Sequence, residues 1–228
     1  MKKYILLYVL FSLIFAESQV IEGWYNIRRQ DNNKKIGYVH HRMVIFGDRI
    51  EQNEDVYIYR SAYNKYILLV AARETMERDL QMRVKQVIRY REGKKTTTKT
   101  VVQGNVVKFF ENGKLVHERE KPKKLYGNFG ARLVKVMTKF VPKTKGKALV
   151  AQNGQVVEVT FEVLAEKSIM AEKQPFHVYP VKFSGEGFVG TTYGSDDGRD
   201  IMFEMEDPYL RWLITSKQDA LSLTEVEK

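Results

Sequence analysis

Cysteine is absent from all 228 residues of the chain. Its absence excludes disulfides, a lipid-modified N-terminal cysteine, a cysteine nucleophile and every metal site built on thiolate ligands. A chain of about 200 residues does not need disulfides, because it is long enough to bury a proper hydrophobic core. We therefore expect one domain that is held together by packing and hydrogen bonds.

Local catalytic and metal-binding motifs are also missing. The sequence has no G-x-S-x-G elbow, P-loop, H-E-x-x-H or dinucleotide-binding fingerprint. Two of its four histidines, His40 and His41, are neighbours in a predicted strand, so they point to opposite faces and cannot bind one metal together. The aspartates around Gly198 miss the EF-hand spacing and are typical of a hairpin turn. We expect no catalytic residue, no metal site and no cofactor.

Long apolar runs are scarce, and the clearest lies at the N-terminus. Residues 5–16 read ILLYVLFSLIFA after the charged start MKKY, and the small residues Ala16 and Ser18 follow. This pattern predicts a secretory signal peptide over residues 1–18, cleaved after Ser18 or, as the second choice, after Ala16. A retained membrane anchor is the alternative, but a membrane-spanning helix needs about 20 apolar residues. We therefore expect a periplasmic protein, with secretion as the alternative.

Acidic residues are fewer than basic ones, and the formal net charge is +10. Such a balance favours contact with anionic surfaces, among them lipid headgroups. Lysines gather in residues 114–124 (KLVHEREKPKK) and 143–147 (KTKGK). Nucleic acid is not expected as a partner, because an exported protein seldom meets any. The alternative is a basic surface that serves solubility and protects sheet edges.

Period-two patterning dominates the rest of the chain. Runs rich in β-branched and aromatic residues alternate with turn signals such as Asn112-Gly113 and Asn153-Gly154. The predicted strands cover residues 24–31, 35–46, 50–60, 66–78, 80–91, 95–103, 106–111, 115–118, 147–151, 155–165, 176–184, 188–193, 199–205 and 210–215.

One internal helix is predicted, over residues 128–140 (NFGARLVKVMTKF). Asn128 can cap its start, and Pro142 ends it. The apolar residues at helical spacing are Phe129, Leu133, Val136, Met137 and Phe140. A second, short helix is expected in the tail, where Ser216 and Asp219 form a capping pattern.

These elements predict a mainly β (β-rich α+β) fold, in which residues 19–228 form a single half-barrel domain. We expect a large curved antiparallel sheet, or an incomplete β-barrel, with the internal helix packed on its concave face. A sheet of many strands must coil, and glycine relieves crowding where a strand bends or another element comes close. Gly37, in the run KKIGYVHHRMVI, is therefore interpreted as a bend in an early, long strand.

The strand predicted over residues 80–91 alternates most cleanly between apolar and basic positions. Successive strand side chains point to opposite faces, so the apolar face should line a cavity and the basic face should dock on an anionic surface. The predicted ligand-binding residues are Tyr66, Leu68, Met82, Val84, Ile88, Tyr90, Leu133 and Met137. The predicted docking residues are Arg83, Lys85, Arg89 and Arg91. An ordinary filled core is the alternative to the cavity.

Several short features carry a resemblance to known proteins. They are the pair Trp24-Tyr25, the stretch Lys35-Ile36-Gly37-Tyr38, a middle helix before Pro142, the hairpin GKALVAQNGQVVEVTFEV, the turn Asp197-Gly198 and a threonine-led tail over residues 215–221. On these features the chain resembles exported bacterial proteins of unassigned function, whose fold is similar to the lipoprotein-localisation factors of the LolA and LolB type. A related arrangement precedes the catalytic domain of some bacterial transglutaminase-like proteins, whose cysteine is missing here.

The resemblance implies an incomplete antiparallel barrel around a helix, with an apolar cavity that holds acyl chains in the carriers. The leading hypothesis is a non-enzymatic periplasmic protein that binds a lipid or a lipidated protein and touches an anionic membrane. A second is an envelope scaffold or assembly factor that binds a protein partner through its sheet and has a filled core. A third is a hydrolase with a triad assembled from distant residues, in which a serine, a histidine such as His117 or His177 and a carboxylate meet in one cleft.

Overall fold

The computed structural model describes residues 18–152, 154–206 and 209–223, so the predicted signal peptide lies almost wholly outside the described residues. Among the described residues, no helix has the length and apolarity that crossing a bilayer requires. The strands are β1 (Gln19–Arg29), β2 (Lys35–Ile45), β3 (Arg49–Arg60), β4 (Lys65–Glu77), β5 (Met82–Arg91), β6 (Lys94–Gln103), β7 (Val106–Glu111), β8 (Lys114–Glu120), β9 (Lys145–Gln152), β10 (Gln155–Val163), β11 (Lys167–Ala171), β12 (Gln174–Gly185), β13 (Phe188–Gly194), β14 (Asp200–Met205) and β15 (Leu210–Thr215). The helices are the short 3-10 turn η1 (Ser61–Tyr63), α2 (Ala131–Thr138) and α3 (Lys217–Leu221).

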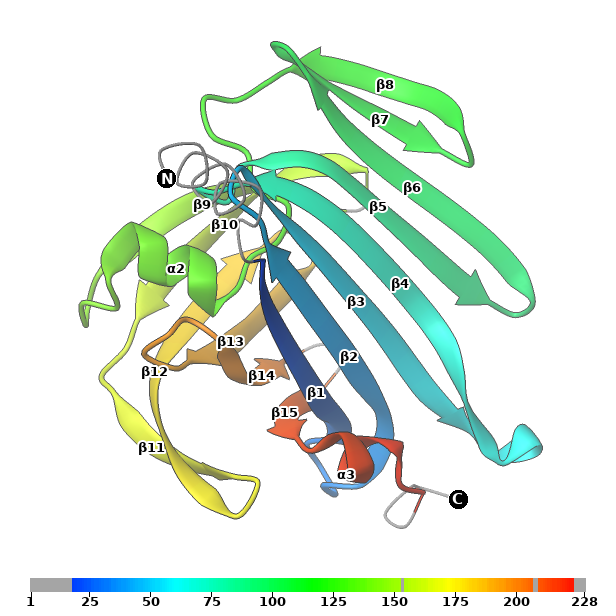
Figure 1. The fold of residues 1–228 in the computed structure, drawn as a ribbon, viewed down its shortest axis with the longest axis vertical. Helices are drawn as coiled ribbons and strands as arrows, with labels where there is room; N and C mark the ends of the chain where they lie inside the picture. The colour runs from blue at the N-terminus through cyan, green and yellow to red at the C-terminus, as the bar shows by residue number, and fades with distance from the viewer. Residues whose placement is uncertain (1–17, 153, 207–208, 224–228) are drawn as a thin grey trace, which may run out of the picture.

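These strands form one large antiparallel sheet that curls without closing (Figure 1), which confirms the predicted mainly β class. Its order is β8-β7-β6-β5-β4-β3-β2-β1-β15-β14-β13-β12-β10-β9, and β11 pairs with β12 off this path. The first strand therefore lies beside the last one, with Trp24 opposite Thr215. Strand β11 had not been predicted, because its turn to β12 uses Glu172 and Lys173 at positive φ and carries no Gly or Asn signal.

A two-residue segment links the sheet across its open side. Tyr126 bridges to Gln81, just before β5, and to Val150 on β9. The amide of Met82 donates to Leu125 O at 2.8 Å, and the amide of Ala151 donates to Tyr126 O at 2.8 Å. These contacts connect the start of β5 with β9 and so complete a ring of strands at one end of the sheet. Strands β6, β7 and β8 extend outside this ring (Figure 1).

Helix α2 occupies the predicted place but is shorter, and its cap is different. Asn128 does not cap it, since the amide of Ala131 donates to Asp200 Oδ1 at 3.0 Å from strand β14. Leu133 and Val134 are buried in the main core, whereas Met137 is 39 % exposed. The prediction that Met137 is a ligand-binding residue is wrong, because the buried side of α2 carries Ala131, Leu133 and Val134 and Met137 lies on its exposed side.

The predicted tail helix α3 is confirmed, and it is anchored by an unexpected residue. The amide of Asp219 donates to Ser216 Oγ at 3.1 Å, as the capping pattern indicates. At the other end the buried Lys35 ammonium donates to Asp219 O at 2.6 Å, and to Ala220 O and Ser222 O at 2.8 Å each. Three carbonyls at a helix C-terminus are a favourable site for a cation.

Gly37 lies beside a shift in strand register and close to the backbone of the neighbouring strand β3. The β1–β2 register shifts next to it, between Ile27 and Arg28, and an irregularity of this kind typically bends a strand. A Cβ at Gly37 would lie 2.2 Å from the backbone oxygen of Tyr57 on β3. The glycine therefore serves the close approach of a neighbouring backbone as well as the bend.

Candidate functional site

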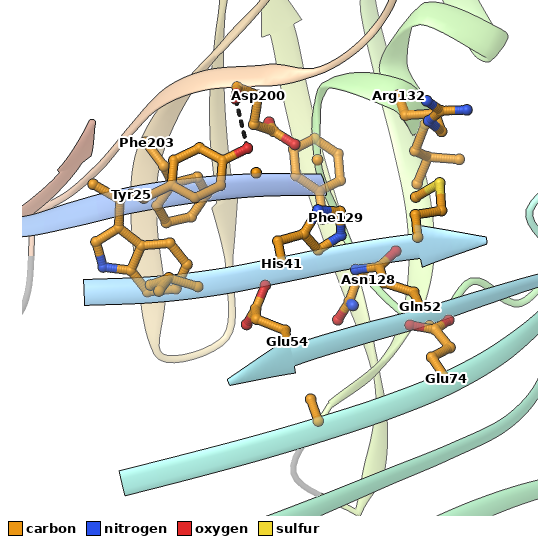
Figure 2. A pocket seen from close by; sticks show the side chains of 18 of the residues that line it. Tyr25, His41, Gln52, Glu54, Glu74, Asn128, Phe129, Arg132, Asp200 and Phe203 are labelled. Atoms are coloured by element: carbon orange, nitrogen blue, oxygen red, sulfur yellow. Dashed lines mark hydrogen bonds between the residues drawn. The ribbon is translucent and has the colours of Figure 1, made fainter. Parts of the chain in front are cut away.

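A cavity of about 500 Å³ lies on the concave face of the sheet, covered by the segment that leads into α2. Strands β1 to β5 supply one side of it, and β12 to β15 supply the other. Figure 2 shows Tyr25, His41, Glu54 and Glu74 on the first side, and Phe129, Asp200 and Phe203 near the second. The two sides differ in chemistry.

The side formed by β12 to β15 is aromatic. The ring of Phe183 stacks on Phe203 with centroids 5.4 Å apart, and Phe203 lies at 5.4 Å from Trp212. Phe129, from the covering segment, lies 5.1 Å from Phe183, and all four residues line the cavity. Offset and tilted rings at these distances form a stable apolar wall.

The opposite side carries charged residues in two rows that follow from strand register. Directly opposite residues share a face, so Gln52, Glu74 and Lys85 form one row across β3, β4 and β5. His41 and Glu54 begin the neighbouring row, which Ala72 and Val87 continue.

Lys85 is fully occupied within the protein. Its ammonium donates to Gly127 O at 2.5 Å, to Asn128 Oδ1 at 2.6 Å and to Ala151 O at 3.1 Å. An ammonium has three donors, so none is left over. Burial lowers the pKa of Lys85, while the nearby Glu74 and Glu54 act in the opposite direction.

Glu74, in contrast to Lys85, has unused hydrogen-bonding groups. Its side chain is buried, and among the described residues neither carboxyl oxygen has a hydrogen-bond partner. Burial raises the pKa of Glu74 to about 7, Lys85 lowers it and Glu54 raises it further. A Cβ at residue 127 would lie 1.4 Å from Glu74 Oε1, so glycine leaves the space that this carboxyl occupies.

Two further ionisable groups of the cavity, His41 and Glu54, are shifted towards their neutral forms. Burial lowers the pKa of His41 to about 4, and a hydrogen bond with Gln52 opposes this shift. The imidazole is therefore neutral at pH 7. Burial also raises the pKa of Glu54, with the Lys85 charge opposing it.

Asp200 and Tyr25 close the far end of the cavity. The Tyr25 hydroxyl donates to Asp200 O at 2.9 Å, drawn in Figure 2. The Asp200 carboxylate accepts from the Ala131 amide and from Thr192 Oγ1. Burial raises the pKa of Asp200, whereas its two hydrogen bonds and Arg132 lower it. Asp200 is thus a structural acceptor that already has its partners.

Of the eight predicted ligand-binding residues, only Leu133 lines this cavity. The β4–β5 register explains why: Met82 pairs with Met76, but Val84 pairs with Thr75, so the extra residue Arg83 reverses the faces. Met82 is buried in a separate cluster with Val107, Phe109, Leu125 and Ala151. The prediction that the apolar face beyond this bulge lines the cavity is wrong.

The remaining predicted residues lie away from the cavity. Val84 and Ile88 are half-buried and share the outer face with their partners Thr75 and Ala71. Tyr90 is 37 % exposed. On β4, Tyr66 donates to Ser222 O at 2.8 Å, and Leu68 stands opposite Tyr57.

The four predicted docking cations do not share one outer face. Lys85 and Arg89 line the cavity. Arg83 pairs with Glu77 at 2.6 Å, and Arg91 is exposed beside Glu92. The same bulge that places the apolar residues of β5 on the outer face places Lys85 and Arg89 on the cavity face.

Glu54 and Glu74 were missed because no local motif contains them. A weak signal exists for Glu74, which is the one acid on the β4 face that otherwise carries Val70, Ala72 and Met76. A lone carboxylate in an apolar alternation indicates a buried polar position with a specific role.

Outside the cavity, the histidines have ordinary surroundings. His117 stacks on Phe109 with centroids 4.4 Å apart. His177 stands opposite Ser168 in the β11–β12 register, but its ring nitrogens face Glu166 at 3.3 Å and Asp196 at 3.8 Å. Within the described ranges, no group of three or more histidines and carboxylates is placed to hold a metal ion.

We find no matching protein-family model, no matching curated protein and no matching solved structure.

Proposed function

We propose that this chain is an exported, non-enzymatic binding protein that holds an apolar ligand, a lipid or a lipidated protein, in its half-barrel cavity. The observation that supports this is the cavity of about 500 Å³ with its aromatic wall. Small-molecule sites typically measure about 300–1,000 Å³ and are mostly apolar. The signal-like sequence of residues 1–18 supports export.

A second candidate function is that of an envelope scaffold or assembly factor. Within the described residues β8 pairs with β7 alone, and the whole strand is exposed. Leu115 and Val116 are 51 % and 59 % exposed there. An open edge with apolar side chains can accept a strand from a partner protein. This function would use the edge of β8 and give the cavity no role.

Contact with an anionic membrane remains part of the proposal, through the lysine-rich stretches and not through the four cations of β5. The stretches 114–124 and 143–147 contain exposed lysines. Each cation near an anionic surface adds about 1 kcal/mol of attraction, which salt weakens. Such contact would bring the cavity close to a source of lipid.

A cavity-filling variant tests the proposal. Val87 lines the cavity from β5, so Val87→Trp should weaken binding of the neutral fluorescent probe N-phenyl-1-naphthylamine by roughly tenfold or more, about 1.4 kcal/mol per tenfold. Val116→Trp, on the exposed β8, is the matched control and should bind like the wild type. Fluorescence titration gives the affinities, and circular dichroism checks the fold.

Equal probe binding by both variants would contradict the proposal, since the probe would then bind elsewhere. Mass spectrometry of an organic extract from natively purified protein separates the two candidate functions. A stoichiometric acyl species is expected for the ligand-binding protein. A folded protein without bound lipid that also fails to bind the probe would favour the scaffold.

A further inference from the structure

The buried carboxyl of Glu74 lacks the partners that buried polar groups normally have. Glu74 is 5 % exposed and lines the cavity, yet both its carboxyl oxygens are without a hydrogen-bond partner among the described residues. An unmatched buried carboxyl is costly, because it loses its hydration and gains nothing in return. A ligand that enters the cavity could supply the missing partner.

Two charged side chains act on the charge of Glu74. Glu54 and Glu74 stand on neighbouring strands and on the same cavity face, and the Lys85 ammonium lies near both. While Glu74 holds its proton, Glu54 and Lys85 balance each other, and Arg89 adds a positive charge further along β5. Ionisation of Glu74 would supply the negative charge that balances a cationic ligand.

Among the described residues, the cations that line the cavity, Lys85, Arg89 and Arg132 among them, do not hydrogen-bond the carboxyl oxygens of Glu74. All three donors of Lys85 are used by Gly127, Asn128 and Ala151. His41 is neutral, and the Arg132 charge interacts with Asp197 and Asp200. The carboxyl of Glu74 therefore keeps its hydrogen-bonding capacity for a ligand.

The aromatic wall supplies the second half of a binding site. Phe183, Phe203 and Trp212 lie on β12, β14 and β15, while Glu54 and Glu74 lie on β3 and β4. An apolar body on one side and a charged group on the other match an amphipathic molecule. Aromatic faces also tolerate a nearby cation.

We propose that the cavity selects amphiphiles with a primary amine head, whose ammonium group binds Glu74 and Glu54 while the apolar body lies against Phe183, Phe203 and Trp212. The inference rests on the proposed binding function and names the head group of its ligand. An ammonium supplies three donors, which can reach the two Glu74 oxygens that have no hydrogen-bond partner among the described residues.

Proton release accompanies this binding. Without ligand, Glu74 keeps a proton up to about pH 7, and an ammonium beside it favours the ionised form. The affinity for an amine should therefore rise between pH 6 and pH 8, where an alkylamine remains protonated. The charged and titratable groups that line the cavity with Glu74 are Glu22 and Tyr25 on β1, His41 on β2, Glu54 on β3, Lys85 and Arg89 on β5, Arg132 on α2, Arg199 just before β14, and Asp200 on β14.

Isothermal titration with three probes of equal chain length, n-octylamine, n-octanol and octanoate, tests the head group on the folded wild type. We expect octylamine to bind about tenfold or more tighter than octanol at pH 8, the range of charge-assisted hydrogen bonds. The ratio should fall at pH 6, while octanol binding stays constant.

Glu74→Gln should weaken octylamine binding by about tenfold and leave octanol binding unchanged. Glu77→Gln is the matched control, since Glu77 lies on the same strand outside the cavity and pairs with Arg83. If Glu74→Gln does not fold, the ratio of octylamine to octanol affinity in the wild type, and its change between pH 6 and pH 8, still test the amine inference.

Equal affinity for amine and alcohol would overturn the amine inference and leave the binding function standing. Tighter binding of octanoate would also overturn it and point to an anionic head. Binding of none of the three probes by folded protein would count against the binding function itself.

Discussion

A substitution at Gly37 tests, through the free energy of unfolding, whether β2 and β3 approach each other closely at this residue. Its missing Cβ would lie 2.2 Å from a backbone oxygen that cannot move aside easily. Gly37→Ala should therefore lower the free energy of unfolding by about 1–3 kcal/mol, as overpacking does. In an ordinary strand the same change would raise it by about 0.5–1 kcal/mol. Urea denaturation measures the sign.

Gly23→Ala on β1 is the control for this change. The nearest atoms to its Cβ would be those of the Tyr25 side chain, at 3.1 Å, and a side chain shifts more easily than a backbone oxygen. A smaller loss than at residue 37 is expected. If Gly37→Ala stabilised the protein, the close approach would be disproved.

Glu74 makes stability depend on pH with a sign opposite to that of a salt-bridged acid. Its pKa is raised from 4.5 to about 7 in the folded chain, so between these values the folded state holds a proton that the unfolded state has lost. The free energy of unfolding should fall as pH rises through this window, by about 3 kcal/mol in all. Glu54 and Asp200, also raised by burial, add to the same trend.

His41 contributes the opposite slope between about pH 4 and 6.5, because its pKa is lowered in the folded state. The comparison of wild type with Glu74→Gln removes this effect, since both keep His41. Urea denaturation at pH 5 and pH 8 should show a smaller loss of stability in the variant. Identical losses would mean that Glu74 does not titrate in this range.

Among single residues, the sequence allowed the capping pair Ser216 and Asp219 to be predicted, because a cap is a contact between near neighbours. It did not allow the role of Asp200 at α2 to be predicted. Asp200 reaches Ala131 from 69 positions away, and Asn128, the local candidate, accepts from Lys85 instead. Long-range partners leave no pattern in a single sequence.

At the level of elements, the tail helix α3 depends on one buried ammonium. Lys35→Met should remove its three hydrogen bonds to α3 and lower the free energy of unfolding by about 1–3 kcal/mol. Limited trypsin digestion should then cut faster at Lys217. Lys34→Met, at the exposed neighbour, should leave both measurements unchanged. Unchanged digestion in Lys35→Met would show that α3 is held by other contacts.

Most strands were predicted from period-two patterns and turn residues, because both are local properties. The faces of β5 were not predicted, since one extra residue at Arg83 reverses them. Nothing in the run LQMRVKQVIRYR marks that bulge, and the pairing with β4 decides where it falls. The predicted ligand-binding and docking residues of β5 depended on this single position.

At the level of the molecule, the curled sheet could be predicted from the number of strands. The residues that line the cavity could not. Aromatic and Met residues were expected around it, but the outer face of β2, β3 and β4 holds many of them: Tyr38 stacks on Tyr57 at 4.6 Å and meets Tyr66 at 4.9 Å. An aromatic-rich strand pair does not reveal which of its faces is concave. The cavity combines the aromatic wall of β12 to β15 with charged residues of β3 to β5, which composition alone would not place inside.

The pairing of β1 with β15 has a consequence for the order in which the molecule is assembled. The chain can form the β1 to β8 meander from neighbours, but Ile27 meets Trp212 only when almost every residue is available. Contacts between such distant positions slow folding. The ring that encloses the cavity is therefore completed late, and a ribosome-bound or truncated chain that ends before Leu210 would have ordered strands but no enclosed interior.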